Sequence, residues 1–117
     1  MNINNLTIKA QEVLQSAMNL ARSDRNQAVE PLHMLDAIVA EDDSVGVFLL
    51  QKLGVNVGAL RSVLRQQVER LPKVEGGEVY FSRESSEAIQ KAGDFTKTFG
   101  DKYASVEHLL LGILTER

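Results

Sequence analysis

The segment Glu30–Val39 (EPLHMLDAIV) and the segment Ser105–Leu114 (SVEHLLLGIL) carry one helical pattern twice, 75 residues apart. At this offset residues 6–41 lie on residues 81–116 without a gap. Seven of these 36 positions are identical: Glu12/Glu87, Gln15/Gln90, Ala17/Ala92, His33/His108, Leu35/Leu110, Ile38/Ile113 and Glu41/Glu116. Further pairs share apolar character: Leu6/Phe81, Val13/Ala88, Leu14/Ile89, Leu20/Phe95, Met34/Leu109 and Val39/Leu114. A gapless match whose apolar positions agree predicts one supersecondary unit used twice.

The first unit has the pattern of four helices, because its apolar residues recur at helical spacing between capping and breaking residues. Pro31 suits the first turn of a helix, Ser44 is a good N-cap, and Gly54 and Pro72 are typical helix ends. We therefore expect helices from about Asn5 to Arg22, from Glu30-Pro31 onward, over Ser44–Leu53, and from about Asn56 to Leu71.

The second unit follows a polar linker that contains Gly76-Gly77. Ser82 should cap its first helix, Gly100 should end that helix, and Ser105 should cap the next. Because no equivalent of residues 42–71 follows, we expect the second unit to be truncated and the natural protein to continue.

The predicted fold is thus one all-α domain over residues 1–117, a tandem pseudo-twofold repeat of a four-helix unit. Repeat one spans 1–72, the linker 73–80 and the partial repeat two 81–117. The three residues Val79-Tyr80-Phe81 come nearest to a strand pattern.

Composition narrows the function classes. The chain has 117 residues, 44% of them hydrophobic, a net charge of −3 and no cysteine. Nothing here makes the basic face that nucleic acid demands, and no apolar run approaches the roughly 20 residues of a membrane span. With no signal peptide visible, we expect a cytoplasmic location and a monomeric isolated domain.

Motifs for catalysis are weak. The glycines form no phosphate-binding loop, so we expect no cofactor and no metal in this chain. His33 and His108 might serve as acid/base groups or ligands, but no second histidine stands one turn away, which favours a structural role in the first helical turn. A Ser–His–Asp site should assemble only by accident of folding.

The repeats also disagree at informative positions. Ile8 pairs with Arg83, Phe99 with Asp24 and Leu111 with Asp36, so one copy of each pair tolerates charge. The apolar member either shields the seam between repeats, which we favour, or forms an exposed patch. Such a patch, ringed by acids, would suit extended polypeptide with apolar and basic side chains.

Several stretches together resemble the N-terminal domain of the Clp ATPases. They are residues 5–14 (NLTIKAQEVL), Glu30-Pro31-Leu32-His33 and residues 105–111 (SVEHLLL). Leu53-Gly54-Val55, residues 71–74 (LPKV) and residues 103–108 (YASVEH) look like the ClpB type, the bacterial disaggregases. The resemblance covers essentially all of the chain.

The resemblance implies a module that binds unfolded or aggregated polypeptide and is not itself an enzyme. The ATPase domains of the parent hexamer, with their ATP and Mg²⁺, would lie elsewhere. It also implies roles in substrate binding for Thr7, Asp101 and Glu107, to which the disagreement between repeats adds Ile8 and Leu111. An adaptor-docking module of the ClpA or ClpC kind is the alternative, and a small hydrolase is a remote one.

Overall fold

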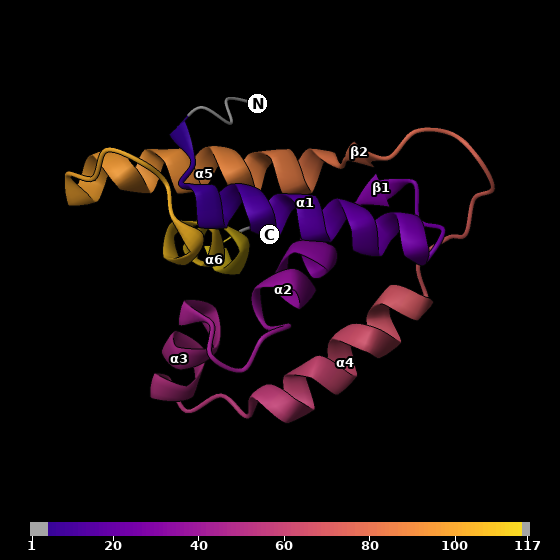
Figure 1. Ribbon diagram of the computed structural model, residues 1–117, viewed down its shortest axis with the longest axis horizontal. Coiled ribbons are helices and arrows are strands. Elements are labelled where there is room, and N and C mark those ends of the chain that lie inside the picture. The colour runs from indigo at the N-terminus through magenta and orange to yellow at the C-terminus, as the bar shows by residue number, and fades with distance from the viewer. Residues whose placement is uncertain (1–4, 116–117) are drawn as a thin grey trace.

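The computed structural model describes residues 5–115, in which helices dominate and two very short strands pair (Figure 1). In chain order the elements are α1 Ile8–Ser23, β1 Ala28–Val29, α2 Pro31–Ile38, α3 Val45–Lys52, α4 Val57–Glu69, β2 Tyr80–Phe81, α5 Arg83–Phe99 and α6 Val106–Thr115. The predicted all-α class is confirmed. The start of the predicted repeat one, at residues 1–4, and the identical pair at Glu116 lie partly outside the described residues.

Capping residues set the helix starts. The Thr7 hydroxyl accepts the Ala10 N–H at 3.1 Å, and the Ser82 hydroxyl accepts the Ser85 N–H at the same distance. Thr7 is extended, with ψ at 162°, so α1 begins at Ile8 and not near Asn5 as predicted. Ser44 and Asn56 likewise cap α3 and α4 through their side chains, which confirms those predicted starts.

Glycine ends α5 as predicted. Gly100 adopts a left-handed conformation with φ at 72°, which a residue with a Cβ rarely adopts. Gly54, at φ 84°, follows Leu53, the C-cap of α3.

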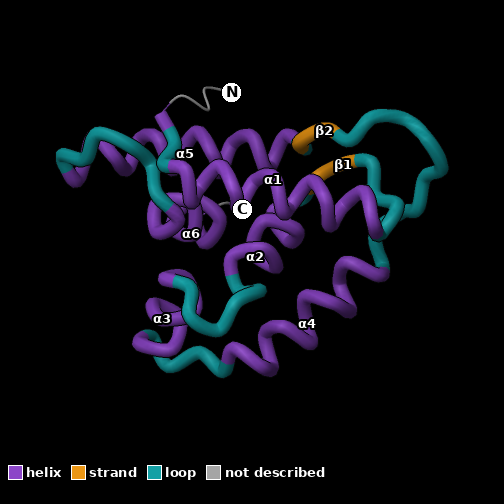
Figure 2. Tube along the Cα trace, viewed as in Figure 1, coloured by secondary structure: helices purple, strands orange, loops and turns teal. Residues whose placement is uncertain are grey.

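The two strands lie side by side (Figure 2) and form a parallel pair, Ala28 with Tyr80 and Val29 with Phe81. Leu6 forms an isolated parallel bridge with Ala104. The offset of 75 residues converts Val29 into Ala104 and Phe81 into Leu6, so one pairing is made twice with the partners exchanged. The Ser82 N–H donates to the Val29 carbonyl at 3.1 Å, and the Thr7 N–H donates to the Ala104 carbonyl at 2.8 Å. This exchange is a twofold-like relation between the halves.

Sequence patterns did not predict strand β1, because two residues give no alternation to detect. Tyr80, at the end of the predicted linker, belongs to β2. The strand pair forms because the start of repeat two meets the segment that precedes α2 in repeat one.

Helix packing follows the same exchange. α2 packs on α1 and α6 packs on α5, while α2 also contacts α5 and α6 also contacts α1. Figure 1 shows α2 and α6 beneath the long helices α1 and α5. Met34 and Ile38 of α2 and Leu109 of α6 are almost wholly buried. α3 contacts α6, and α4 contacts α2 and α3. The core therefore spans both repeats.

Candidate functional site

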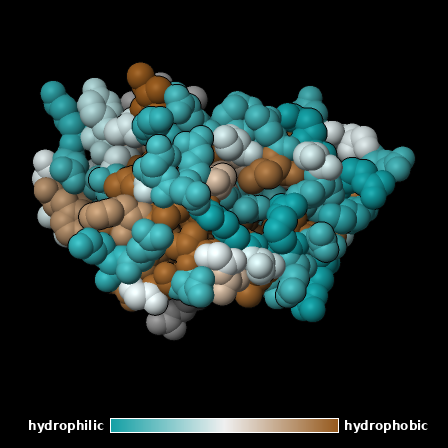
Figure 3. Space-filling model, turned by 60° about the horizontal axis from the view of Figure 1, so that its bottom comes forward, coloured by the Kyte–Doolittle hydropathy of each residue, from teal (hydrophilic) through white to brown (hydrophobic). Residues whose placement is uncertain are grey.

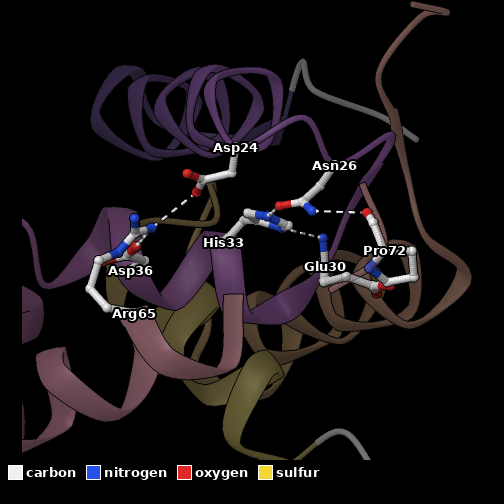
Figure 4. Close-up of polar contacts among 7 residues, drawn as sticks. All are labelled: Asp24, Asn26, Glu30, His33, Asp36, Arg65 and Pro72. Carbon is white, nitrogen blue, oxygen red and sulfur yellow. Dashed lines mark hydrogen bonds and ion pairs between the residues drawn. The ribbon is translucent and has the colours of Figure 1, made fainter. Parts of the chain in front are cut away.

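His33 lies in the first turn of α2 and is fully buried (Figure 4). Its Nδ1 accepts the Glu30 N–H at 2.9 Å, and its Nε2 lies 2.9 Å from the Asn26 Oδ1. Because an amide oxygen only accepts, Nε2 must carry the hydrogen. The Asn26 amide in turn donates to the Pro72 carbonyl at 3.1 Å, which connects the segment after α4 to the start of α2 through His33. We call this arrangement a histidine clasp.

Burial lowers the pKa of His33, although the negative charges of Asp24, Glu30 and Asp36 oppose that shift. The Arg65 guanidinium adds to the lowering and binds Asp24 at 3.1 Å and Asp36 at 2.9 Å (Figure 4). His33 is therefore a neutral, hydrogen-bonded core residue near neutral pH. The structural interpretation of His33 is confirmed.

Repeat two forms a second histidine clasp at the equivalent positions. The His108 Nδ1 accepts the Ser105 N–H at 3.0 Å, and its Nε2 lies 2.9 Å from the Asp101 Oδ2. The offset of 75 residues relates Asn26 to Asp101, Glu30 to Ser105 and His33 to His108. The amide acceptor of the first clasp is thus a half-exposed carboxylate in the second.

A serine, a histidine and an aspartate do come together here, contrary to expectation. The Ser105 hydroxyl lies 2.9 Å from the His108 Nδ1, opposite the bond to Asp101. However, that Nδ1 already accepts the Ser105 N–H, and the hydroxyl donates its only hydrogen to Glu107. Repeat one forms the same clasp with no hydroxyl. The geometry is that of a helix start, and it leaves the serine without a free base.

The residues implied by the resemblance lie along one connected stretch. Thr7 caps α1 and bonds to Ala104, while Asp101 holds His108 next to Glu107 in the first turn of α6. Leu111 lies one turn further along α6, on the solvent side with Glu107. The hydroxyl of Thr7 is committed to the cap, so it is a positioning group for the start of α1.

The three apolar residues at which the repeats disagree are exposed. Ile8 is 75% exposed, Phe99 57% and Leu111 36%. The favoured role in shielding the seam is therefore wrong, because each of the three residues is exposed to solvent. Phe99 stacks on Phe95 with ring centroids 6.1 Å apart and lies 6.2 Å from the His108 ring.

A cavity of about 220 Å³, which Ile8, Phe99 and Leu111 do not line, lies at the seam between the repeats. Leu6 and Ala104, the bridged pair, line it together with side chains of α5; the full lining is Asn5, Leu6, Ser86, Ile89, Gln90, Gly93 and Ala104. We call it the seam groove. The sequence pattern predicted Ile8 as a substrate-binding residue but did not indicate the α5 wall of this cavity, because the buried Ile89 looks like any core residue in the sequence.

Apolar side chains also reach the surface elsewhere, as Figure 3 shows on a face where they are bordered by hydrophilic residues. Among residues 5–115, no cluster of three or more histidine or acidic side chains is arranged to hold a metal ion. No single helix in that range has the length and apolar content to cross a membrane, although α3 and α4, bent by 114°, pass that test as a pair.

Comparisons of the sequence and of the fold with known proteins both find Clp N-terminal domains. The model of the Clp repeat (R) N-terminal domain matches residues 5–117. The chaperone protein ClpB of Bacteroides thetaiotaomicron is 49% identical over 115 residues, which are 98% of this chain and 13% of that relative. This chain therefore corresponds to a small part of the relative.

Solved structures share the fold. The Hsp104 N-terminal domain from Candida albicans has a TM-score of 0.86 at 21% identity, covering 96% of this chain and 75% of that one. A ClpV N-domain in complex with a VipB peptide has a TM-score of 0.83 at 19% identity, covering 97% and 69%. Because the family model matches residues 5–117 of this chain, and a ClpB chaperone is 49% identical over 98% of it, this chain belongs to the Clp repeat N-terminal domain family.

Proposed function

We propose that this chain is the non-catalytic polypeptide-binding module of a ClpB-like, ATP-dependent protein disaggregase. The parent protein would be a cytoplasmic hexamer whose AAA+ domains bind ATP and Mg²⁺ and pull on the chains that this module captures. The similarity to ClpB and the peptide seen on the ClpV N-domain support this assignment.

One observation carries the proposal. The seam groove is lined by the apolar residues Leu6, Ile89 and Ala104 where the two repeats meet. The helices to which these lining segments lead or belong carry exposed apolar residues, namely Ile8 on α1, Phe99 on α5 and Leu111 on α6. Exposed apolar side chains can bury their surface against the apolar residues that an unfolded chain exposes, and removal of both surfaces from water is favourable. A site of this kind binds weakly and tolerates many sequences.

The experiment compares an unfolded protein with its native form. Reduced, carboxymethylated α-lactalbumin should bind the chain in a fluorescence titration, whereas native α-lactalbumin should not. Ile8→Ser/Phe99→Ser should weaken that binding by about tenfold, since two apolar contacts of about 0.7 kcal/mol each are lost.

Leu53→Ser/Val63→Ser is the matched control. These residues are 72% and 50% exposed, close to the values for Ile8 and Phe99. Leu53 follows the last residue of α3 and Val63 lies on α4, and neither lines the seam groove. Equal binding of the two forms of α-lactalbumin, or an equal loss in both double variants, would contradict the proposal.

Adaptor docking is the second candidate, and it predicts a different partner. A folded adaptor would bind with one-to-one stoichiometry and would not compete with carboxymethylated α-lactalbumin for the seam groove. Capture from lysate followed by that competition separates the two functions.

A further inference from the structure

A second hollow, of about 330 Å³, lies between α1, the turn from α2 to α3, and the start of α6. It shares no lining residue with the seam groove. We call it the acid-rimmed groove; it is lined by Lys9, Glu12, Val13, Ser16, Ala37, Ile38, Glu41, Asp43, Ser44, Val45 and Val106.

The floor of the acid-rimmed groove is apolar. Ile38 is 1% exposed and Val106 is 7% exposed. Val13 and Ala37, which also line the groove, are half-buried. Val45, at the start of α3, is 41% exposed and forms part of the wall. The floor can therefore take up the hydrocarbon part of an incoming side chain.

The rim carries three carboxylates and one ammonium group. Glu12 lies 3.8 Å from Lys9, but both side chains are largely exposed, so this pair is weak. Among the described residues the side chains of Glu41 and Asp43 have no hydrogen-bond or ion-pair partner, unlike their neighbour Asp42, which binds Arg61 at 2.8 Å. The rim thus keeps two uncompensated negative charges above an apolar floor.

Ser44 does not change this balance. Its hydroxyl donates to the Ile38 carbonyl at 2.9 Å and accepts the Val47 N–H at 3.1 Å, so it is used in holding α3 against α2. The carboxylates of Glu41 and Asp43 remain the polar groups available to a ligand on that side.

An aliphatic stem that ends in a cation matches both features. Arginine and lysine bury their methylene groups on apolar surface and keep the charge at its edge, and arginine can meet a carboxylate with two parallel N–H donors. We propose that the acid-rimmed groove docks an arginine side chain of an unfolded polypeptide. This inference rests on the proposed function and assigns to the module a preference for apolar segments that contain a basic residue.

The experiment uses the full chain and three labelled peptides that differ at one position. Each has a central residue between two leucines, and that residue is arginine, citrulline or lysine. Citrulline keeps the shape of arginine and removes its charge. Fluorescence anisotropy at low salt should give an affinity for the arginine peptide about fivefold above that for the citrulline peptide, as two solvent-exposed charge contacts would produce.

Glu41→Gln/Asp43→Asn should lower the affinity of the chain for the arginine peptide to its affinity for the citrulline peptide. Glu69→Gln/Glu78→Gln removes the same charge from exposed positions on α4 and the linker, and it should keep most of the preference. Amide NMR shifts on adding the arginine peptide should map to Val13, Ala37 and Val106.

Equal affinity for arginine and citrulline, an equal loss in both double variants, or NMR shifts confined to the seam groove would each overturn the inference. The proposed function is tested separately with carboxymethylated α-lactalbumin. If carboxymethylated α-lactalbumin binds while the arginine and citrulline peptides bind equally, the proposed function is supported and the arginine preference is contradicted. If carboxymethylated α-lactalbumin does not bind while the arginine preference depends on Glu41 and Asp43, the arginine site is supported and the proposed function is contradicted.

Discussion

At the scale of single residues, the most informative difference between the repeats is the acceptor of each histidine clasp. His33 donates to the neutral amide of Asn26, whereas His108 meets the carboxylate of Asp101. The neutral ring satisfies both clasps, so the two histidines hold equivalent helix starts through different acceptors.

The pKa of His33 is lowered in the folded chain from the ordinary value of 6.5, mainly by burial. As the pH falls through that ordinary value, the unfolded chain binds a proton that the folded chain excludes, and the free energy of unfolding decreases. We expect urea unfolding to show lower stability at pH 5.5 than at pH 7.5. Asn26→Asp should make this decrease smaller, because a carboxylate stabilises the protonated ring.

Asn26→Asp should also lower stability at pH 7.5, since the Pro72 carbonyl loses its donor. Comparison of the two pH values within each variant removes that constant cost. An unchanged or steeper decrease in Asn26→Asp would contradict the role given to His33.

Thr7 and Asp101 belong to the same scale. Thr7→Ala/Asp101→Ala should weaken binding of carboxymethylated α-lactalbumin while the helical circular dichroism signal persists. Loss of the Thr7 cap should cost about 1 kcal/mol of stability, which urea unfolding measures. Ser82→Ala removes the equivalent cap in repeat two and should lower stability without an equal loss of binding. Unchanged affinity in the double variant would remove both residues from the site.

At the scale of elements, the contact between α5 and α6 depends on one missing side chain. A Cβ at Gly112 would overlap the backbone carbonyl of Ala88, which cannot move without shifting α5. The repeat-related residue is Ala37, so the closest approach is specific to repeat two. This contact sets how α6 presents Glu107 and Leu111.

Gly112→Ala should destabilise the chain by about 2 kcal/mol, as overpacking in a well-packed contact does. Gly93→Ala is the control in α5, where a Cβ meets nothing within 4 Å. Because alanine is the better helix former, Gly93→Ala should gain about 0.5 kcal/mol or more. Thermal unfolding of both variants checks the pair, and a stable Gly112→Ala would mean that α6 shifts freely on α5.

At the scale of the whole molecule, the two repeats interlock. Each starts by pairing with the other, and each second helix contacts the first helix of the other repeat. Contacts that cross between halves couple their unfolding into one cooperative transition.

This arrangement predicts that the linker is not needed to hold the halves together. A chain cut between Gly76 and Gly77, both exposed and at positive φ, should elute from a sizing column as one species of unchanged size. Elution as two separate fragments, with the uncut chain run alongside, would show that the interlocking contacts are too weak to hold the repeats.

Local sequence determined the helices and most of their caps, since helical spacing and capping residues act within a few positions of one another. It also determined the repeat, because both copies keep apolar residues at the same places. Only the tertiary structure decided the exchanged strand pairs, the exposure of Ile8, Phe99 and Leu111, and the acid-rimmed groove. Each of these depends on residues dozens of positions apart meeting in space, and no local pattern of spacing or propensity contains that information.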